Sequence, residues 1–138
     1  MTTTTISNTH ALESTHESLA LVEQLIDKLC LEYEIQEEVI GNIVVAVTEA
    51  VNNAISHGNQ LDKTKKVEFT YTYTGSELAF KLTDEGVGFD PSTVPDPTDP
   101  ENVDKPYGRG IFIMQNLSDE ILFENGGRTS VLKFKLRD

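Results

Sequence analysis

A run of apolar residues with helical spacing dominates the first half of the chain. It predicts a helix that is buried over most of its circumference, formed by Val39, Ile40, Ile43, Val44, Val47, Ala50, Val51, Ala54 and Ile55. Glu49 is the only charged residue between Val39 and His57, and it shares the remaining strip of the helix with Asn42, Asn53 and Ser56. Such a strip suits a polar cavity better than bulk water. Because Glu49 and Asn53 lie one turn apart and point the same way, the sequence predicts a helix that carries a polar site.

The spacing of apolar residues predicts helices first and strands afterwards. One helix is expected over about 13–31, capped by Ser14 or Thr15, and the second over about 36–57, closed by a left-handed turn at Gly58 and Asn59. Alternation then predicts a β-hairpin over 66–74 and 77–83, and a short helix near 111–117 followed by strands over 118–123 and 130–136. This order predicts an α/β fold, a two-layer α/β sandwich in which helices cover one face of a mixed, mostly antiparallel sheet.

Composition limits the classes of partner and location. With 138 residues we expect a single domain over 1–138. Lys plus Arg 11 against Asp plus Glu 23 gives a net charge of -12, which opposes nucleic-acid binding. Cys30 is the one cysteine, so no internal disulfide forms, and a reducing cytoplasm is expected. No apolar run approaches the roughly 20 residues of a membrane span, so a membrane is not an expected partner.

One segment lacks any regular pattern. All five prolines fall between Pro91 and Pro106, and residues 84–104 contain seven acids and no base. A long irregular loop within a small domain is usually functional or disordered. We therefore expect a mobile lid over about 89–107.

Two glycine-containing segments flank this expected lid. In DEGVGFD, residues 84–90, Asp84 can accept a hydrogen bond from a ligand amine, while Gly86 and Gly88 leave bare backbone that a flat ring can approach. A plain turn favours the same residues. In YGRGIFIMQNL, residues 107–117, Gly108 and Gly110 lead into a helix whose free N–H groups can bind phosphate, with positive charge from Lys105 and Arg109. A plain loop-to-helix junction is the alternative. For His57, one turn beyond Asn53, the favoured interpretation is that it holds the end of its helix.

Three features follow one another along the chain: the helix with Glu49 and Asn53, the segment 84–90 and the segment 107–117. Together and in this order they resemble the nucleotide-binding boxes of the superfamily that includes gyrase and histidine-kinase ATP-binding domains. The runs EAVNNAISHG and GRGIFIMQNLSDEI more specifically resemble the small anti-sigma factor serine kinases, over about residues 10–136. The resemblance implies a histidine-kinase-like ATPase fold of the Bergerat type, with ATP and Mg²⁺ as cofactors.

The resemblance also implies a role for each matched residue. Glu49 would be the general base, Asn53 the Mg²⁺ ligand and Asp84 the acceptor for the adenine amine; Gly86 and Gly88 would shape the base pocket, and Gly108 and Gly110 would carry the lid hinge and phosphate contacts. The implied activity is an ATP-dependent protein serine kinase that phosphorylates a STAS-type anti-anti-sigma partner and otherwise sequesters a sigma factor, commonly as a homodimer. The alternative is an ATP-binding regulatory module that sequesters a partner with little or no phosphotransfer.

Overall fold

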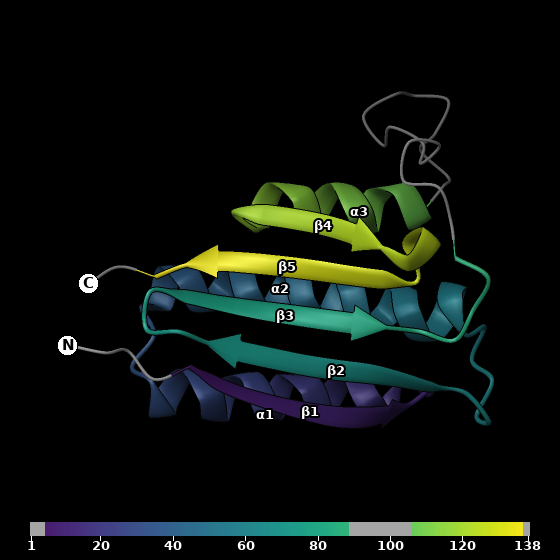
Figure 1. Ribbon diagram of the computed structural model, residues 1–138, viewed down its shortest axis with the longest axis horizontal. Coiled ribbons are helices and arrows are strands. Elements are labelled where there is room, and N and C mark those ends of the chain that lie inside the picture. The colour runs from purple at the N-terminus through teal and green to yellow at the C-terminus, as the bar shows by residue number, and fades with distance from the viewer. Residues whose placement is uncertain (1–4, 89–105, 137–138) are drawn as a thin grey trace.

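The computed structural model describes residues 5–88 and 106–136, which form one antiparallel sheet with helices on one face (Figure 1). In chain order the elements are β1 (Ile6–Glu13), α1 (Glu17–Glu32), α2 (Glu37–Asn52), the π-helical turn η1 (Asn53–Gly58), β2 (Lys66–Tyr73), β3 (Glu77–Thr83), α3 (Pro106–Leu117), β4 (Glu120–Glu124), the 3₁₀ turn η4 (Asn125–Gly127) and β5 (Thr129–Lys135). The strand order is β1-β2-β3-β5-β4, and each neighbouring pair is antiparallel. The two-layer α/β sandwich is confirmed; the described strands form an antiparallel sheet, where a mixed one was expected.

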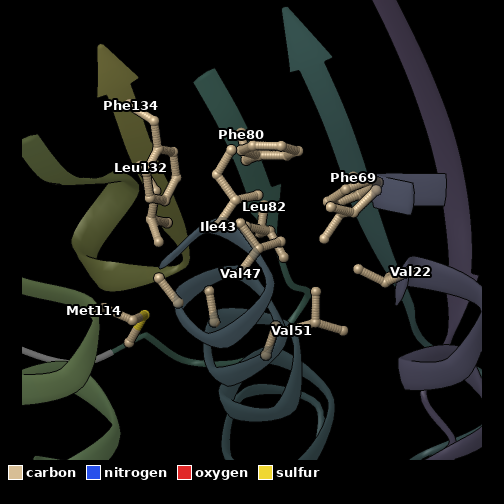
Figure 2. Packing of buried hydrophobic residues seen from close by; sticks show 14 of the residues in the cluster. Val22, Ile43, Val47, Val51, Phe69, Phe80, Leu82, Met114, Leu132 and Phe134 are labelled. Atoms are coloured by element: carbon tan, nitrogen blue, oxygen red, sulfur yellow. The ribbon is translucent and has the colours of Figure 1, made fainter. Parts of the chain in front are cut away.

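The core lies between the sheet and α2. Alternation along β2, β3 and β5 directs one set of side chains toward the helices, and these are fully or almost fully buried: Val67, Phe69, Leu78, Phe80, Leu82, Leu132 and Phe134. Figure 2 shows Ile43, Val47 and Val51 of α2 facing this set, with Val22 of α1 on one side and Met114 of α3 on the other. Burying each such side chain stabilises the fold by about 1.5–3 kcal/mol. This packing fixes α2, and with it Glu49, beneath the centre of the sheet.

One helical segment, Glu37–Gly58, is long and apolar enough to cross a membrane when only length and composition are considered. In this fold its buried residues, which include Ile43, Val47 and Val51, belong to the core. The central helix of a two-layer domain is long and apolar because it forms the core, so these two properties alone do not indicate a membrane span.

The expected order, helices first and strands afterwards, is wrong at the N-terminal end, where β1 precedes α1. β1 pairs with β2 from Ile6↔Tyr73 to Glu13↔Lys66. Its sequence alternates only weakly between apolar and polar residues, because polar Asn8 occupies a position opposite Tyr71 of β2. The Tyr71 hydroxyl accepts a hydrogen bond from Asn8 Nδ2 at 2.7 Å. As an edge strand, β1 is defined by its partner more than by its own side chains.

The helix boundaries also differ from the expected ones. Since β1 extends to Glu13, α1 begins at Glu17, and the Ser14 hydroxyl donates to the Lys65 carbonyl at 2.6 Å and caps no helix. α3 begins at Pro106, ahead of the expected 111–117, and proline is well suited to a first helical turn. The expected lid over 89–107 lies outside the described residues except for 106 and 107, which belong to α3. The single-domain organisation remains a prediction.

Candidate functional site

A cavity of about 240 Å³ lies at the end of α2, between β3, α3 and the start of β5. Its apolar lining consists of Ala50, Ala54, Leu82, Ile111, Met114 and Phe123. Its remaining lining residues are Asn53, His57, Gly58, Asp84, Gly88, Gly127, Arg128 and Ser130. An apolar surface with a few convergent polar groups is the usual construction of a small-molecule site.

The polar strip of the central helix reaches this cavity through a change of helix type. α2 passes at Asn53 into the π-helical turn η1, in which the Asn59 N–H donates to the Ala54 carbonyl at 2.8 Å. Such π-turns within helices frequently occur at functional sites. The expected left-handed conformation of Asn59 is wrong, because its φ is -88° and the positive φ angles occur later, at Gln60 and Leu61.

Asn53 carries a buried polar atom that has no partner among the described residues. That atom is the side-chain Nδ2, and Asn53 itself lines the cavity. A buried donor without an acceptor costs about 1–3 kcal/mol, so a native protein rarely keeps one without a reason. The amide of Asn53 therefore suits a group that enters the cavity from outside the chain.

Gly110 brings α3 against Glu49 of α2 and Asn53 of η1. A Cβ atom at Gly110 would lie 3.0 Å from Glu49 Oε2 and 3.2 Å from Asn53 Nδ2. Only a bare backbone allows the helix this close without displacing the two side chains. The segment that follows residues 89–105 therefore meets Glu49 and Asn53 in space.

The expected phosphate-binding residues are only partly placed by the structure. Gly108 lies in the first turn of α3, among the residues whose N–H groups have no partner within an α-helix. Gly110 lies beyond that turn, so the expectation that both glycines precede the helix is wrong, because the helix starts at Pro106. Lys105 lies outside the described residues, and for Arg109 the structure describes only its place in α3.

Asp84 follows the last residue of β3 and is half-buried in the cavity wall. Its Oδ1 accepts a hydrogen bond from the Gly86 N–H at 2.8 Å, and its own N–H donates to the Arg128 carbonyl at 2.9 Å. Burial raises the pKa of the Asp84 carboxyl above its ordinary value, although the Gly86 N–H and the charges of Arg128 and Lys65 act in the opposite direction. An ionised Asp84 thus gains from a ligand that donates a hydrogen bond to it.

Glycines surround the Asp84 carboxylate because the chain segments touch there. A Cβ on Gly58 would overlap the carboxylate, and one on Gly86 would overlap the Gly58 carbonyl oxygen. Gly88 has a φ of +80°, and a Cβ there would overlap the carbonyl oxygen of Gly126. Gly86 and Gly88 therefore let these backbone segments touch beside Asp84. That they also leave backbone open to a flat ring stays a prediction.

Sequence reasoning misses the contribution of Arg128, just before β5, and of Ser130 within β5. Arg128 and Ser130 both line the cavity, and Arg128 is the sole Lys or Arg among the lining residues that the structure describes. One signal was present in the sequence: Ser130 occupies a position that alternates with buried Leu132 and Phe134. A polar residue at the inward-facing start of an apolar strand indicates a cavity at that end.

Residues 5–88 and 106–136 contain no group of three or more His, Cys, Asp or Glu side chains placed to hold a metal ion. Mg²⁺ that arrives with a nucleotide takes most of its ligands from phosphate and water, so one protein oxygen can complete its shell. Asn53 lines the cavity and carries an amide oxygen of the kind that requirement calls for. Its Nδ2, which has no partner among the described residues, is a donor and suits an acceptor such as a phosphate oxygen. His57 also lines the cavity.

Comparison with known proteins agrees with this geometry. The model of the family described as histidine kinase-like ATPase domain matches residues 12–135. An anti-sigma F factor of Clostridium perfringens is 30% identical over 106 residues, which is 72% of this chain and 74% of the relative. A serine-protein kinase RsbW of Bacillus licheniformis is 31% identical over 107 residues, which is 72% of this chain and 67% of the relative.

The fold also has a solved counterpart. The crystal structure of the RsbU and RsbW domains of a Mycobacterium tuberculosis protein superposes with a TM-score of 0.68 at 18% identity, covering 95% of this chain and 32% of that one. At this identity the similarity shows the fold alone. Together with the family match, these findings show that the chain belongs to the histidine kinase-like ATPase family and, within it, to the group of anti-sigma factors and serine-protein kinases.

Proposed function

We propose that the protein is an ATP-dependent protein serine kinase that acts as an anti-sigma factor. The observation that carries this proposal is the approach of Gly110 to both Glu49 and Asn53, beside the cavity that Asp84 lines. This approach of residues from three separate segments supports a nucleotide site with a candidate base next to it.

The adenine ring fits the apolar part of the cavity. Leu82, Ile111 and Met114 offer surfaces for a flat ring, and the Asp84 carboxylate accepts a hydrogen bond from the exocyclic amine. In this arrangement Gly86 and Gly88 keep the approach to Asp84 free of side chains.

The amide oxygen of Asn53 would hold Mg²⁺, and the free N–H groups in the first turn of α3, including that of Gly108, would face the phosphates. Lys105 and Arg109 are proposed as the positive charges on this side. When bound, Mg-ATP supplies the phosphoryl group for transfer.

Glu49 would serve as the general base. Its carboxylate accepts the proton of a serine hydroxyl on the protein substrate, and in doing so orients the hydroxyl oxygen for attack. A positioned base contributes roughly 10²- to 10⁴-fold to such a step. Phosphoryl transfer otherwise needs mainly positioning and charge neutralisation, which the cavity and the helix terminus provide.

The names of the relatives suggest the partners. Anti-sigma factors and RsbW kinases are similar to this chain, so we propose a STAS-type anti-anti-sigma protein as the phosphorylated partner and a sigma factor as the sequestered one, with a homodimer as the assembly. The test is to incubate the protein with labelled ATP and each STAS protein of its source organism. Labelled phosphoserine on one of them is the expected result, and no transfer to any of them would contradict the kinase assignment.

The second candidate is a regulatory module that binds ATP and sequesters its partner with little phosphotransfer. It is favoured by one observation: Glu49 is not among the residues that line the cavity, although it lies beside Asn53. Sigma-factor capture that depends on ATP, without any labelled product, would select this candidate.

A further inference from the structure

Asn59 is a buried polar residue to which the proposed mechanism gives no role. Its side chain is 0% exposed, directly after η1. Its Oδ1 accepts the Glu85 N–H at 2.8 Å, and its Nδ2 donates to Ser14 Oγ at 3.0 Å and to the Lys66 carbonyl at 3.1 Å. The side-chain amide thus bonds three separate segments of the chain.

The bond to Glu85 acts on the peptide that follows Asp84. On its other side, the Asp84 N–H is held by the Arg128 carbonyl. The Glu85 carboxylate gives the same loop a further tie, since it accepts the Lys66 N–H at 2.5 Å, but that tie runs through an exposed side chain. The Asn59 bond is the one that originates from a fully buried group.

Backbone contact beside Asn59 leaves the loop little freedom. The Cβ overlaps described for Gly58 and Gly86 show that the end of η1 lies directly against residues 84–86. Asn59 is therefore placed where a single side chain can set the distance between the helix and the Asp84 loop.

We propose that Asn59 is a positioning residue for purine selectivity: through the Glu85 N–H it holds the Asp84 carboxylate where it meets an adenine amine and rejects a guanine carbonyl. This inference rests on the proposed function, because adenine is the ligand that it discriminates. Recognition of this kind requires placement to within about 0.5 Å, and a shift of about 1 Å can cost up to 10²-fold.

A purely structural role predicts a different outcome. If Asn59 only satisfied buried groups, its loss would lower stability and would affect ATP and GTP alike. The matched control is Val22→Ala, which removes buried volume on the α1 side of the core, opposite Met114 in Figure 2, at a residue that does not line the cavity. Ser14→Ala is the second control, since it removes one Nδ2 acceptor and leaves the bond to Glu85 intact.

The experiment is calorimetric titration of Mg-ATP and Mg-GTP into the wild type, Asn59→Ala, Asn59→Ser and the two controls, at a temperature where thermal melts show all of them folded. Wild type is expected to prefer ATP by at least about tenfold. Both Asn59 variants should narrow this ratio by roughly threefold or more. Val22→Ala and Ser14→Ala should lower the melting temperature and keep the wild-type ratio.

The possible failures are distinct. Wild-type protein that binds neither nucleotide would overturn the proposed function itself. Wild-type protein that prefers ATP, together with Asn59 variants that keep the full preference, would overturn the positioning role of Asn59 and leave the proposed function standing.

Discussion

Glu49 is the residue on which the difference between a kinase and an ATP-binding module depends. Glu49→Gln keeps the shape of the side chain next to Gly110 and removes the proton acceptor. We expect phosphotransfer to a STAS partner to fall by roughly 10²-fold or more while Mg-ATP affinity changes little. Single-turnover transfer and calorimetry measure the two quantities separately, and an unchanged transfer rate would remove Glu49 from the mechanism.

Asn53 is expected to matter through the metal. Asn53→Ala removes the proposed Mg²⁺ ligand together with the buried Nδ2 that has no partner in the described part of the chain. Mg-ATP binding should weaken by about tenfold or more, whereas adenosine, which carries no metal, should bind nearly as before. Stability should not fall, because the variant loses no hydrogen bond of that nitrogen. Equal losses for both ligands would point to a damaged pocket.

Asp84 links the binding site to the pH dependence of stability. Since burial raises the pKa of its carboxyl, the native protein holds this proton to a higher pH than the unfolded chain does. The contribution of Asp84 to stability is therefore complete below its unfolded pKa, about 3.9, and declines as the pH rises through the native pKa.

Asp84→Asn should remove that decline. Its amide oxygen can still accept the Gly86 N–H, so the apo variant should gain stability relative to wild type as the pH rises from about 4 toward neutrality. Urea unfolding at a series of pH values measures this difference. A difference that stays constant across the series would show that the pKa of Asp84 is unchanged by folding.

At the scale of elements, the contact of α3 with α2 is the most specific feature of the site. Gly110→Ala should favour α3 as a helix, since alanine is better than glycine by about 0.8–1 kcal/mol, but its methyl group would crowd Glu49 and Asn53. We expect a melting temperature that is unchanged or raised, together with phosphotransfer reduced by about tenfold or more.

Gly41→Ala is the matched control for that substitution. It lies within α2, and a Cβ there would meet nothing within 4 Å. This variant should gain a similar increment of stability and keep full activity. Equal activity in the two variants would show that the Gly110 approach has no part in catalysis.

Sequence patterns predicted those elements whose apolar residues show their own periodicity. β2 and β3 appear within a residue of their expected ends, because Val67, Phe69, Leu78 and Phe80 alternate into the core. β1 was missed since its inward positions include Asn8 and His10, and its pairing with β2 is a tertiary property. The π-turn η1 and the early start of α3 were missed for the same reason, as neither leaves a local hydrophobic pattern.

The candidate site was predicted only in the parts that a motif marks. Glu49, Asn53 and Asp84 stand out as polar residues in apolar elements, and the structure brings the first two to Gly110 and the last to the neighbouring cavity wall. No motif marks Asn59 or Arg128, because their importance depends on which distant loop they touch. Such long-range contacts are set by the fold and cannot be predicted from the spacing of apolar residues along the sequence.

Across the whole molecule, topology explains how separate segments reach one site. β5 lies between β3 and β4, and the end of β3 pairs with the start of β5 at Thr83↔Thr129. Asp84, which follows β3, therefore lies beside Arg128, which precedes β5. α2 runs beneath these strands with its C-terminal end toward the same side (Figure 1). An antiparallel two-layer sandwich therefore collects its polar residues at one end and leaves the apolar core intact.

Net charge gives the last prediction, which concerns the stability of the entire chain. A net charge of -12 destabilises a compact state through self-repulsion. The ion pairs Lys66–Glu13 and Lys133–Glu120 are both substantially exposed and offset little of it. Adding NaCl from about 0.01 to 0.15 M shortens the screening length from about 30 to 8 Å, so the melting temperature should rise.

The control for this effect is a change of pH. Near the isoelectric point, about pH 4.5, the net charge vanishes and the same salt series should leave the melting temperature nearly constant. NaCl also affects protein stability in ways that do not depend on net charge. An equal rise in melting temperature at both pH values would therefore show that the stabilisation comes from such charge-independent effects. A rise confined to neutral pH would show that repulsion among the acidic side chains limits the stability of this fold.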